Sequence, residues 1–278
     1  MSHFRVAITG TSSGIGAACV SLLRDCESVE VIALGRNVYS PLSIVLDLCH
    51  MASVRNAVTC LAERWYGSER ETSGGHDIFI NNAGVFSGKT PREVWRVNLI
   101  APCFLTETLV GLFVKSTLTR RSLRLVHVGS RLEKQSQMSS DNILSLSEAM
   151  NEATSEISSD RVYADTKRGL ILHTAYMCSK FADNKQLSFS VVTPGMVNTN
   201  LGLSSVSRIV WYLTAPLRFL LLRHPIEGAV AVLWAAFSEE NGTYSADPGE
   251  VLERISETRD KRAGSLISEL VNEQFNVM

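Results

Sequence analysis

The stretch ITGTSSGIG, residues 8–16, places three glycines directly behind a short apolar run. FRVAIT before it has the content of a buried strand, and IGAACVSLLR after it has the apolar spacing of a helix. Gly10, Gly14 and Gly16 therefore lie at a strand-to-helix turn, where glycine permits positive φ and close approach to the backbone. The N-terminus of the helix would seat a phosphate, and a dinucleotide pyrophosphate fits this turn. Glycines and serines also occur in turns that only reverse the chain.

The bulk composition is that of an ordinary soluble globule. The chain has 278 residues, a net charge of −1 and 45% hydrophobic residues, which gives no basic surface for nucleic acid. The six cysteines lack C-x-x-C spacing and the six histidines lack H-E-x-x-H spacing, so we expect a reducing compartment and no metal site. Because the first strand follows Met1 closely, we expect no signal peptide and a cytoplasmic location.

Strand and helix patterns alternate along the chain. Strands are expected at Val29–Gly35 and Leu42–Asp47 and in DIFINNAG, LRLVHVGS and LSFSVVTPG, and helices in VRNAVTCLAERW, from Pro91, and from about Arg161 to Asn184. This order predicts an α/β fold with a doubly wound parallel sheet, a three-layer Rossmann fold in a single domain over residues 1–278. The link RNVYSP between the second and third strands is too short for a helix, so we expect it to be extended.

Tyr163 and Lys167 form a Y-x-x-x-K pair, which puts a phenol and an ammonium on one helix face. The pattern is common by itself, but it occurs here with the glycine turn, with NNAG at residues 81–84 and with Ser130, each at the end of a strand. Together these motifs resemble the short-chain dehydrogenase/reductase family, in its T-G-x-x-x-G-x-G branch. The resemblance runs from Thr9 to the C-terminal helix and implies a nicotinamide-dependent oxidoreductase.

The resemblance implies the roles of three residues. Tyr163 is the general acid/base, Lys167 holds the nicotinamide ribose and lowers the tyrosine pKa, and Ser130 binds the reacting oxygen. A free phenol titrates near pH ~10, and a close ammonium favours the phenolate, so we expect the pKa of Tyr163 to be lowered. Ser130 would donate a hydrogen bond where oxyanion charge develops.

Asn98 matches the asparagine of a family helix. Pro102, four residues later, has no N–H, so the carbonyl of Asn98 lacks its helical partner and is free to hold a water. The resemblance implies that this water links Asn98 to Lys167 and starts a proton relay. The alternative is a proline that only bends the helix.

The resemblance also implies a cofactor site built from several strand ends. We expect it to contain Gly10, Ser12, Ser13, Gly14, Ile15 and Gly16 of the turn, Arg36, Asp47, Leu48, Asn82, Ala83, Gly84, Tyr163 and Lys167, and Pro194, Gly195, Val197 and Thr199 of TPGMVNT. Asp47 would meet the adenine amino group, although a helix N-cap role explains it equally well.

The pair Gly35-Arg36 at the end of the second strand favours NADP(H) over NAD(H). An acidic side chain there repels a 2′-phosphate, whereas Gly35 leaves the position empty and Arg36 offers a planar charged fork. Ser13 stands where many NADP-preferring relatives carry a second basic residue. With Arg36 as the one basic residue, we expect only a moderate preference for NADP(H) over NAD(H).

Two segments of the chain, an insert and a lid, are candidates for contacts with the substrate, with a second subunit or with a membrane. An insert at about residues 131–160 resembles that of retinol-dehydrogenase and carbonyl-reductase-like members, and it would either wall the substrate site or cover the helix faces that family dimers bury. The sequence therefore leaves the oligomeric state open, and a homo-oligomer is compatible with it. Residues 206–223, within a lid at about 200–223, are apolar but too short and too charged to span a bilayer. They form either a substrate lid or a peripheral membrane contact.

We therefore expect an NADP(H)-dependent oxidoreductase that moves a hydride between nicotinamide and a carbonyl or alcohol with an apolar body. A non-catalytic NADP(H)-binding sensor or scaffold of the same fold is the alternative, although such relatives commonly lose the tyrosine or the lysine. A sugar-nucleotide epimerase is disfavoured because that branch spaces its glycines T-G-x-x-G-x-x-G and has a longer substrate domain.

Overall fold

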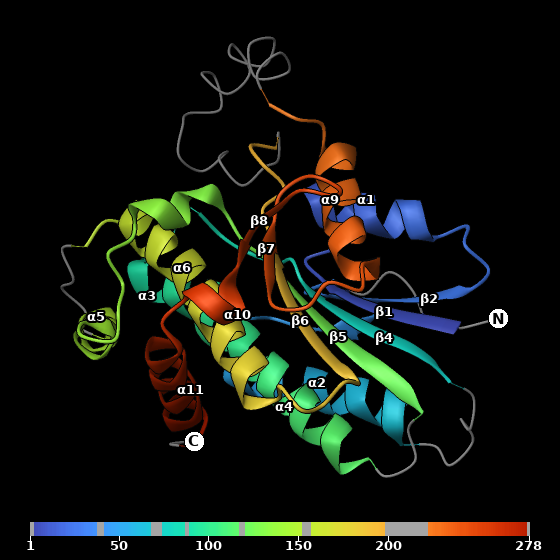
Figure 1. Cartoon of the computed structure of the whole chain (residues 1–278), viewed down its shortest axis with the longest axis horizontal. Helices are drawn as coiled ribbons and strands as arrows, with labels where there is room; N and C mark the ends of the chain where they lie inside the picture. The colour runs from blue at the N-terminus through green and yellow to red at the C-terminus, as the bar shows by residue number, and fades with distance from the viewer. Residues whose placement is uncertain are drawn as a thin grey trace.

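An eight-stranded sheet runs through the centre of the molecule in the order β3-β2-β1-β4-β5-β6-β7-β8 (Figure 1). The structure is a computed structural model that describes residues 3–37, 42–67, 74–86, 89–116, 120–151, 157–197 and 222–276. Helices cover both faces of the sheet (Figure 1), which confirms the predicted three-layer α/β/α fold.

The strands are β1 (His3–Thr9), β2 (Val29–Gly35), β3 (Ile44–Val45), β4 (Gly75–Asn81), β5 (Arg121–Val128), β6 (Leu187–Val192), β7 (Thr243–Ser245) and β8 (Val251–Arg254). Neighbours from β3 to β7 pair in parallel, as predicted. The last strand, β8, which the sequence did not predict, is antiparallel to β7. The strand expected over Leu42–Asp47 shortens to two residues.

The helices are α1 (Gly14–Leu23), α2 (Met51–Tyr66), α3 (Pro91–Trp95), α4 (Ala101–Lys115), α5 (Ile143–Asn151), α6 (Ser159–Lys180), α9 (Pro225–Phe237), α10 (Ile255–Thr258) and α11 (Lys261–Asn276). Helices α1 and α9 pack together on one face of the sheet, and α2, α4 and α6 cover the other face (Figure 1). Helix α11 packs outside them, against α6 and α4. Helix α6 ends at Lys180, earlier than expected, because a turn follows it.

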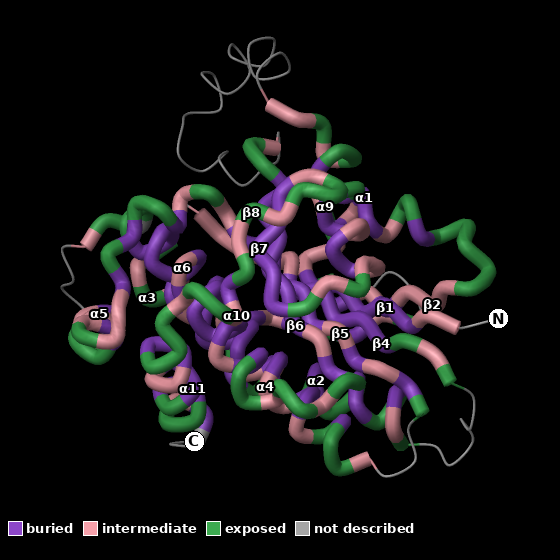
Figure 2. Tube along the Cα trace, in the orientation of Figure 1, coloured by how far each residue is buried: buried purple, intermediate pink, exposed green. Residues whose placement is uncertain are grey.

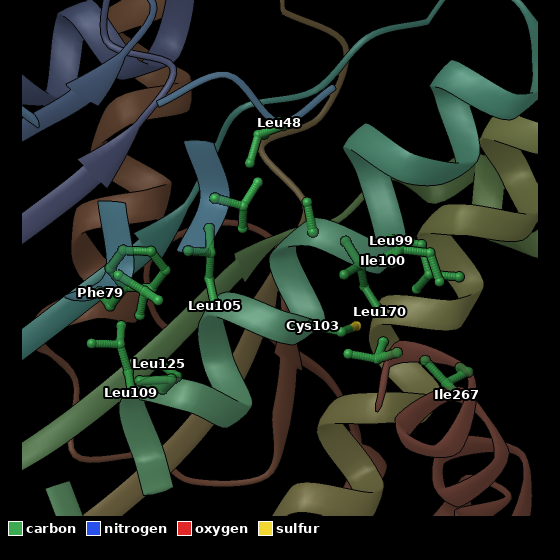
Figure 3. Close-up of a cluster of buried hydrophobic side chains, with 14 of the residues drawn as sticks. Leu48, Phe79, Leu99, Ile100, Cys103, Leu105, Leu109, Leu125, Leu170 and Ile267 are labelled. Carbon is green, nitrogen blue, oxygen red and sulfur yellow. The ribbon is translucent and has the colours of Figure 1, made fainter. Parts of the chain in front are cut away.

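The two largest clusters of the core lie on opposite faces of the sheet, because successive strand residues point to opposite faces. Val6, Ile8 and Ile80 are buried against α1 and α9, whereas Ala7 and Phe79 belong to the larger cluster on the other face. The central strands β1, β4, β5 and β6 are accordingly buried along most of their length (Figure 2). Figure 3 shows Phe79, Leu105, Leu109 and Leu125 of the larger cluster, together with Leu99, Leu170 and Ile267.

Residues 91–115 form a long helical stretch, with a π-helical turn, η1 (Arg96–Ile100), between α3 and α4. Thr90 and Glu93 form a capping box at the N-terminus of this stretch. The stretch is long and apolar enough to cross a membrane, but it is mostly buried inside the fold. Its position against α2, α6 and β5 is that of a core helix.

Of the predicted insert, the structure describes residues 131–151 and 157–160, which contain the short helix η2 (Arg131–Gln135), α5 and the start of α6. Helices η2 and α5 pack against α6, α3 and α11, and Met138, Ile143 and Met150 join the larger core. None of the residues that the structure describes within 131–151 lines the large pocket described below. Ser130, which directly precedes the insert, does line it. The lid predicted at 200–223 lies outside the described residues except for Leu222 and Arg223.

Candidate active site

The glycine turn packs directly against the end of β4. Gly10 has φ +72°, and a Cβ there would lie 2.8 Å from the Cα of Ala83. A Cβ on Gly16 would overlap the carbonyl oxygen of Gly10 and lie 2.5 Å from Nδ2 of Asn82. Any larger residue would push the turn away from β4, so these two glycines bring the start of α1 up to the sheet end.

Thr9 and Asn82 join the two strand ends by hydrogen bonds. The Oγ1 of Thr9 accepts from the backbone N–H groups of Asn82 at 3.0 Å and Ala83 at 2.9 Å. In return, Nδ2 of Asn82 donates to the carbonyl oxygens of Thr9 at 2.8 Å and Gly10 at 3.2 Å. The first and fourth strands therefore present one fixed edge to a ligand.

An open pocket of about 710 Å³ lies along the carboxyl ends of the strands. Of the residues predicted for the site, the structure places the following at its wall: Gly10, Ser12, Ser13, Gly14, Ile15, Arg36, Asp47, Leu48, Asn82, Ala83, Gly84, Ser130, Tyr163, Lys167, Pro194, Gly195 and Val197. Gly16 and Asn98 lie behind the wall, and Thr199 lies outside the described residues. One pocket thus joins the glycine turn to the Y-x-x-x-K pair.

Asn98 is buried and fixes the loop that follows NNAG. Its Nδ2 donates to the carbonyl oxygen of Val85 at 2.7 Å, and its Oδ1 accepts from the N–H of Val85 at 2.8 Å. A Cβ on Gly84 would lie 3.3 Å from that Oδ1 and 3.7 Å from Nζ of Lys167. The side chain of Asn98 therefore shapes the corner that Lys167 occupies, a role that the sequence did not predict.

Pro102 tests the proposed relay through the carbonyl of Asn98. Pro102→Ala supplies an N–H at the position four residues after Asn98, where a helical hydrogen bond would occupy that carbonyl. We expect turnover to fall more than cofactor affinity does. Steady-state kinetics together with a cofactor titration would check this. An unchanged turnover number would leave the proline with a bending role only.

Lys167 and Tyr163 lie together on α6, beneath the end of β5. The Nζ of Lys167 donates to the carbonyl oxygen of Val128 at 2.8 Å and lies 5.5 Å from the ring centroid of Tyr163. The ring of Phe86 meets the Tyr163 ring edge-on, with centroids 4.7 Å apart. Ser130 begins η2, where its Oγ accepts from the N–H of Leu132 at 3.3 Å. These contacts place phenol, ammonium and hydroxyl at one end of the pocket.

Burial dominates the protonation of this group. It raises the pKa of Tyr163 to about 12, and a hydrogen bond with Ser130 opposes part of this rise. It lowers the pKa of Lys167 to about 8. The expected lowering of the tyrosine pKa is therefore wrong for this structure, because loss of solvation penalises both charged forms. Near neutral pH the phenol is protonated, which is the form that can give a proton to a carbonyl oxygen.

Asp47 and Arg36 lie at the other end of the pocket. The Oδ1 of Asp47 accepts from the N–H of Cys49 at 2.9 Å, while His50 is the N-cap residue of α2, so the N-cap alternative for Asp47 is wrong. Arg36 is exposed, and a Cβ on Gly35 would meet no atom within 4 Å. This end of the pocket is therefore open and partly charged.

Sequence reasoning missed a second charged pair at this end. Lys89 and Glu93 both line the pocket, with Nζ and Oε1 3.0 Å apart, and Arg36 lowers the pKa of Lys89 while Glu93 raises it more strongly. The sequence predicted only that a helix begins at Pro91. No local motif shows that this start lies beside Arg36.

Among the described residues, no group of three His, Cys, Asp or Glu side chains is placed to hold a metal ion. The six cysteines are free. Cys19, Cys103 and Cys178 are buried, as expected for small core residues, but Cys26 and Cys60 are exposed.

Comparisons with known proteins bear on the family and the fold of the chain. No family model matches the chain. Dehydrogenase/reductase SDR family member 13 from Bos taurus is 29% identical over 92% of this chain and 69% of that protein, and the Homo sapiens protein gives the same values. A 3-alpha-hydroxysteroid dehydrogenase from Pseudomonas sp. B-0831, complexed with NADH, is 24% identical with a TM-score of 0.64, covering 87% of this chain and 94% of that one. The NADPH-bound carbonyl reductase from chicken fatty liver is 18% identical with a TM-score of 0.62, covering 91% and 99%.

Proposed function

Since the chain belongs to the short-chain dehydrogenase/reductase family and is a nicotinamide-dependent oxidoreductase, we propose that it uses NADP(H) to interconvert a carbonyl and an alcohol on a substrate with an apolar body. The observation that carries the proposal is the meeting of Tyr163, Lys167 and Ser130 at one end of a pocket whose other end holds Arg36. The sensor alternative would need neither the phenol nor the ammonium.

The pocket fits a dinucleotide. The glycine turn forms a cradle that a Cβ at Gly10 or Gly16 would fill, and the N-terminus of α1 follows it directly. Backbone N–H groups at that helix start would hold the pyrophosphate. Lys167 would hold the nicotinamide ribose, and Arg36 would meet a 2′-phosphate. When bound, the cofactor supplies or accepts the hydride.

The residues at the buried end would handle the proton. In carbonyl reduction, the protonated phenol of Tyr163 gives its proton to the substrate oxygen, and the hydroxyl of Ser130 donates a hydrogen bond to the same oxygen as charge develops. The ammonium of Lys167 then stabilises the phenolate that forms. Alcohol oxidation uses the same atoms in reverse, and the ring of Phe86 packs edge-on against the phenol ring.

The proposal of an apolar substrate body is supported by the surface beside the pocket. Met196 lies between two pocket residues, Gly195 and Val197, and is 75% exposed. The sequence at 206–223, further along the chain, is also apolar.

A substrate screen tests the proposal. Purified protein is incubated with NADPH or NADH and a panel of ketones and aldehydes of increasing apolar size, and oxidation of the cofactor is recorded. We expect turnover with NADPH that improves with apolar size. Dinucleotide binding without turnover across the panel would favour the non-catalytic sensor, and better turnover of small polar carbonyls would contradict the apolar substrate.

The cofactor choice is tested at Gly35 and Arg36. A charge-assisted hydrogen bond from Arg36 is worth about 1.5 to 3 kcal/mol, or roughly 10- to 150-fold in favour of NADP(H). Gly35→Asp combined with Arg36→Ile should invert the preference, and the open space around Gly35 admits the new carboxylate. The ratio of kcat/KM with NADPH to that with NADH measures this. An unmodified protein that prefers NADH would show that Arg36 does not meet the phosphate.

A further inference from the structure

The pocket wall after β6 lies beside the buried end of the pocket. The N–H of Gly129 donates to the carbonyl oxygen of Val192 at 2.8 Å, which holds the end of β6 next to the strand end that carries Ser130. Pro194, Gly195 and Val197 follow and line the pocket. Gly195 has φ +78°, so the chain turns sharply here.

Arg223 docks on this wall from the outside. The backbone N–H of Arg223 donates to the carbonyl oxygen of Met196 at 2.9 Å, and Val197 and Arg223 form an isolated parallel β-bridge. A Cβ on Gly195 would lie 3.4 Å from both Cδ and Nε of Arg223. The side chain of Arg223 therefore lies across Gly195, although Arg223 itself does not line the pocket.

Asp247 ties the guanidinium of Arg223 to the sheet. Nη2 of Arg223 donates to Oδ2 of Asp247 at 2.9 Å, and Nη1 donates to Oδ1, so the pair is bidentate. Asp247 lies in a turn just after β7, where the N–H of Glu250 donates to its carbonyl oxygen at 2.8 Å. The wall and β7 are themselves joined, because the N–H of Thr193 donates to the carbonyl oxygen of Ser245 at 2.8 Å.

We propose that the Arg223–Asp247 pair positions the wall at residues 194–197 and so sets the affinity for the nicotinamide half of the dinucleotide. The inference rests on the proposed function, since it assumes that this end of the pocket receives nicotinamide. Both side chains are 39% exposed, and such a pair adds little to global stability. Its bidentate geometry instead fixes a direction, which is what a positioning contact requires.

The wall has a second support on its inner side. A Cβ on Gly228 of α9 would lie 2.9 Å from Cγ2 of Val197 and 3.1 Å from Cγ1 of Ile15, so Val197 packs close to both the helix and the glycine turn. Loss of the outer support should therefore loosen the wall without unfolding it. We expect a moderate loss of cofactor affinity rather than loss of the site.

The test compares three variants by titration with NADPH and NADH, using the fluorescence of the bound reduced dinucleotide, and by steady-state kinetics. Arg223→Met removes the guanidinium but keeps an apolar stem, Asp247→Asn keeps the shape but removes the charge, and the third variant combines them. Arg254→Met and Glu240→Gln serve as controls, because they break another exposed pair, 3.4 Å apart, away from the wall.

We expect each single variant to weaken dinucleotide binding by about two- to fivefold, to raise the KM for the cofactor similarly and to leave kcat nearly unchanged. The double variant should be no weaker than Arg223→Met alone, because the two residues act as one unit. The control variants should bind as the unmodified protein does.

Unchanged binding in both single variants would overturn the positioning role, even if their melting temperatures fall, and so would additive losses in the double variant. Failure of the unmodified protein to bind either dinucleotide would overturn the proposed function, and the positioning role with it.

Discussion

We expect Tyr163→Phe to lower turnover by about 10² to 10⁴-fold and to leave dinucleotide binding nearly intact, because loss of a positioned acid/base costs that much in rate. The substitution removes only the hydroxyl, so the ring keeps its edge-on contact with Phe86 and its place in the core. The assay measures kcat with a responsive carbonyl and binding by NADPH fluorescence.

Tyr176→Phe is the matched control for this variant. Tyr176 lies on the same helix, where its ring packs beneath the ammonium of Lys180, and it does not line the pocket. We expect the turnover number of Tyr176→Phe to equal that of the unmodified protein. Near-normal turnover in Tyr163→Phe would remove the phenol from the mechanism.

Lys167→Met has two opposite effects in this account. Turnover should fall by at least 10²-fold and cofactor binding should weaken, because the residue that stabilises the phenolate and holds the ribose is lost. The protein should nevertheless resist unfolding better near pH 7. A lysine that is only 4% exposed, with its pKa lowered by burial from 10.5 to about 8, costs about 3 kcal/mol of stability when it is charged. Loss of its hydrogen bond to Val128 offsets about 1 kcal/mol of that gain.

The pH dependence follows from the direction of that shift. Between pH 8 and 10.5 the unfolded chain binds the lysine proton more tightly than the folded protein does, so the stability of the unmodified protein rises with pH in this range. The stability advantage of Lys167→Met should be full below pH 8 and shrink as the pH approaches 10.5. Chemical unfolding from pH 7 to pH 10 measures this, with exposed Lys180→Met as the control. A variant that is less stable at pH 7, with no change in the difference up to pH 10, would contradict the burial of a charged lysine.

The sequence predicted the fold wherever a strand is a continuous buried run. β1, β4, β5 and β6 are mostly buried runs, and their ends carry the glycine turn, NNAG and Ser130, so the edge that holds the site followed from the order of the elements. β7 has three residues and β8 alternates between half-buried and exposed positions, so neither has an apolar signal. Their pairing depends on packing at the end of the sheet.

The site was less predictable where it depends on tertiary contacts. Lys89 lies more than fifty residues from Arg36, so no local pattern shows that it lines the pocket. Asp247 lies in a turn with no motif, so no local pattern shows that it binds Arg223. The predicted direction of the pKa shift of Tyr163 was wrong for the same reason. The spacing of Tyr163 and Lys167 shows that the two groups are neighbours, whereas the loss of their solvation depends on β5, Phe86 and the rest of the fold.

Transfer of deuterium tests the central claim most directly. The unmodified protein is incubated with NADPH that carries deuterium at C4 of the nicotinamide, on either face in separate reactions, and with the apolar ketone that it turns over best. We predict deuterium on the carbinol carbon of the alcohol from one of the two labelled cofactors, and none with Tyr163→Phe in the same time. Binding of NADPH with no deuterium in any product, from either label, would contradict the assignment of hydride transfer to this pocket.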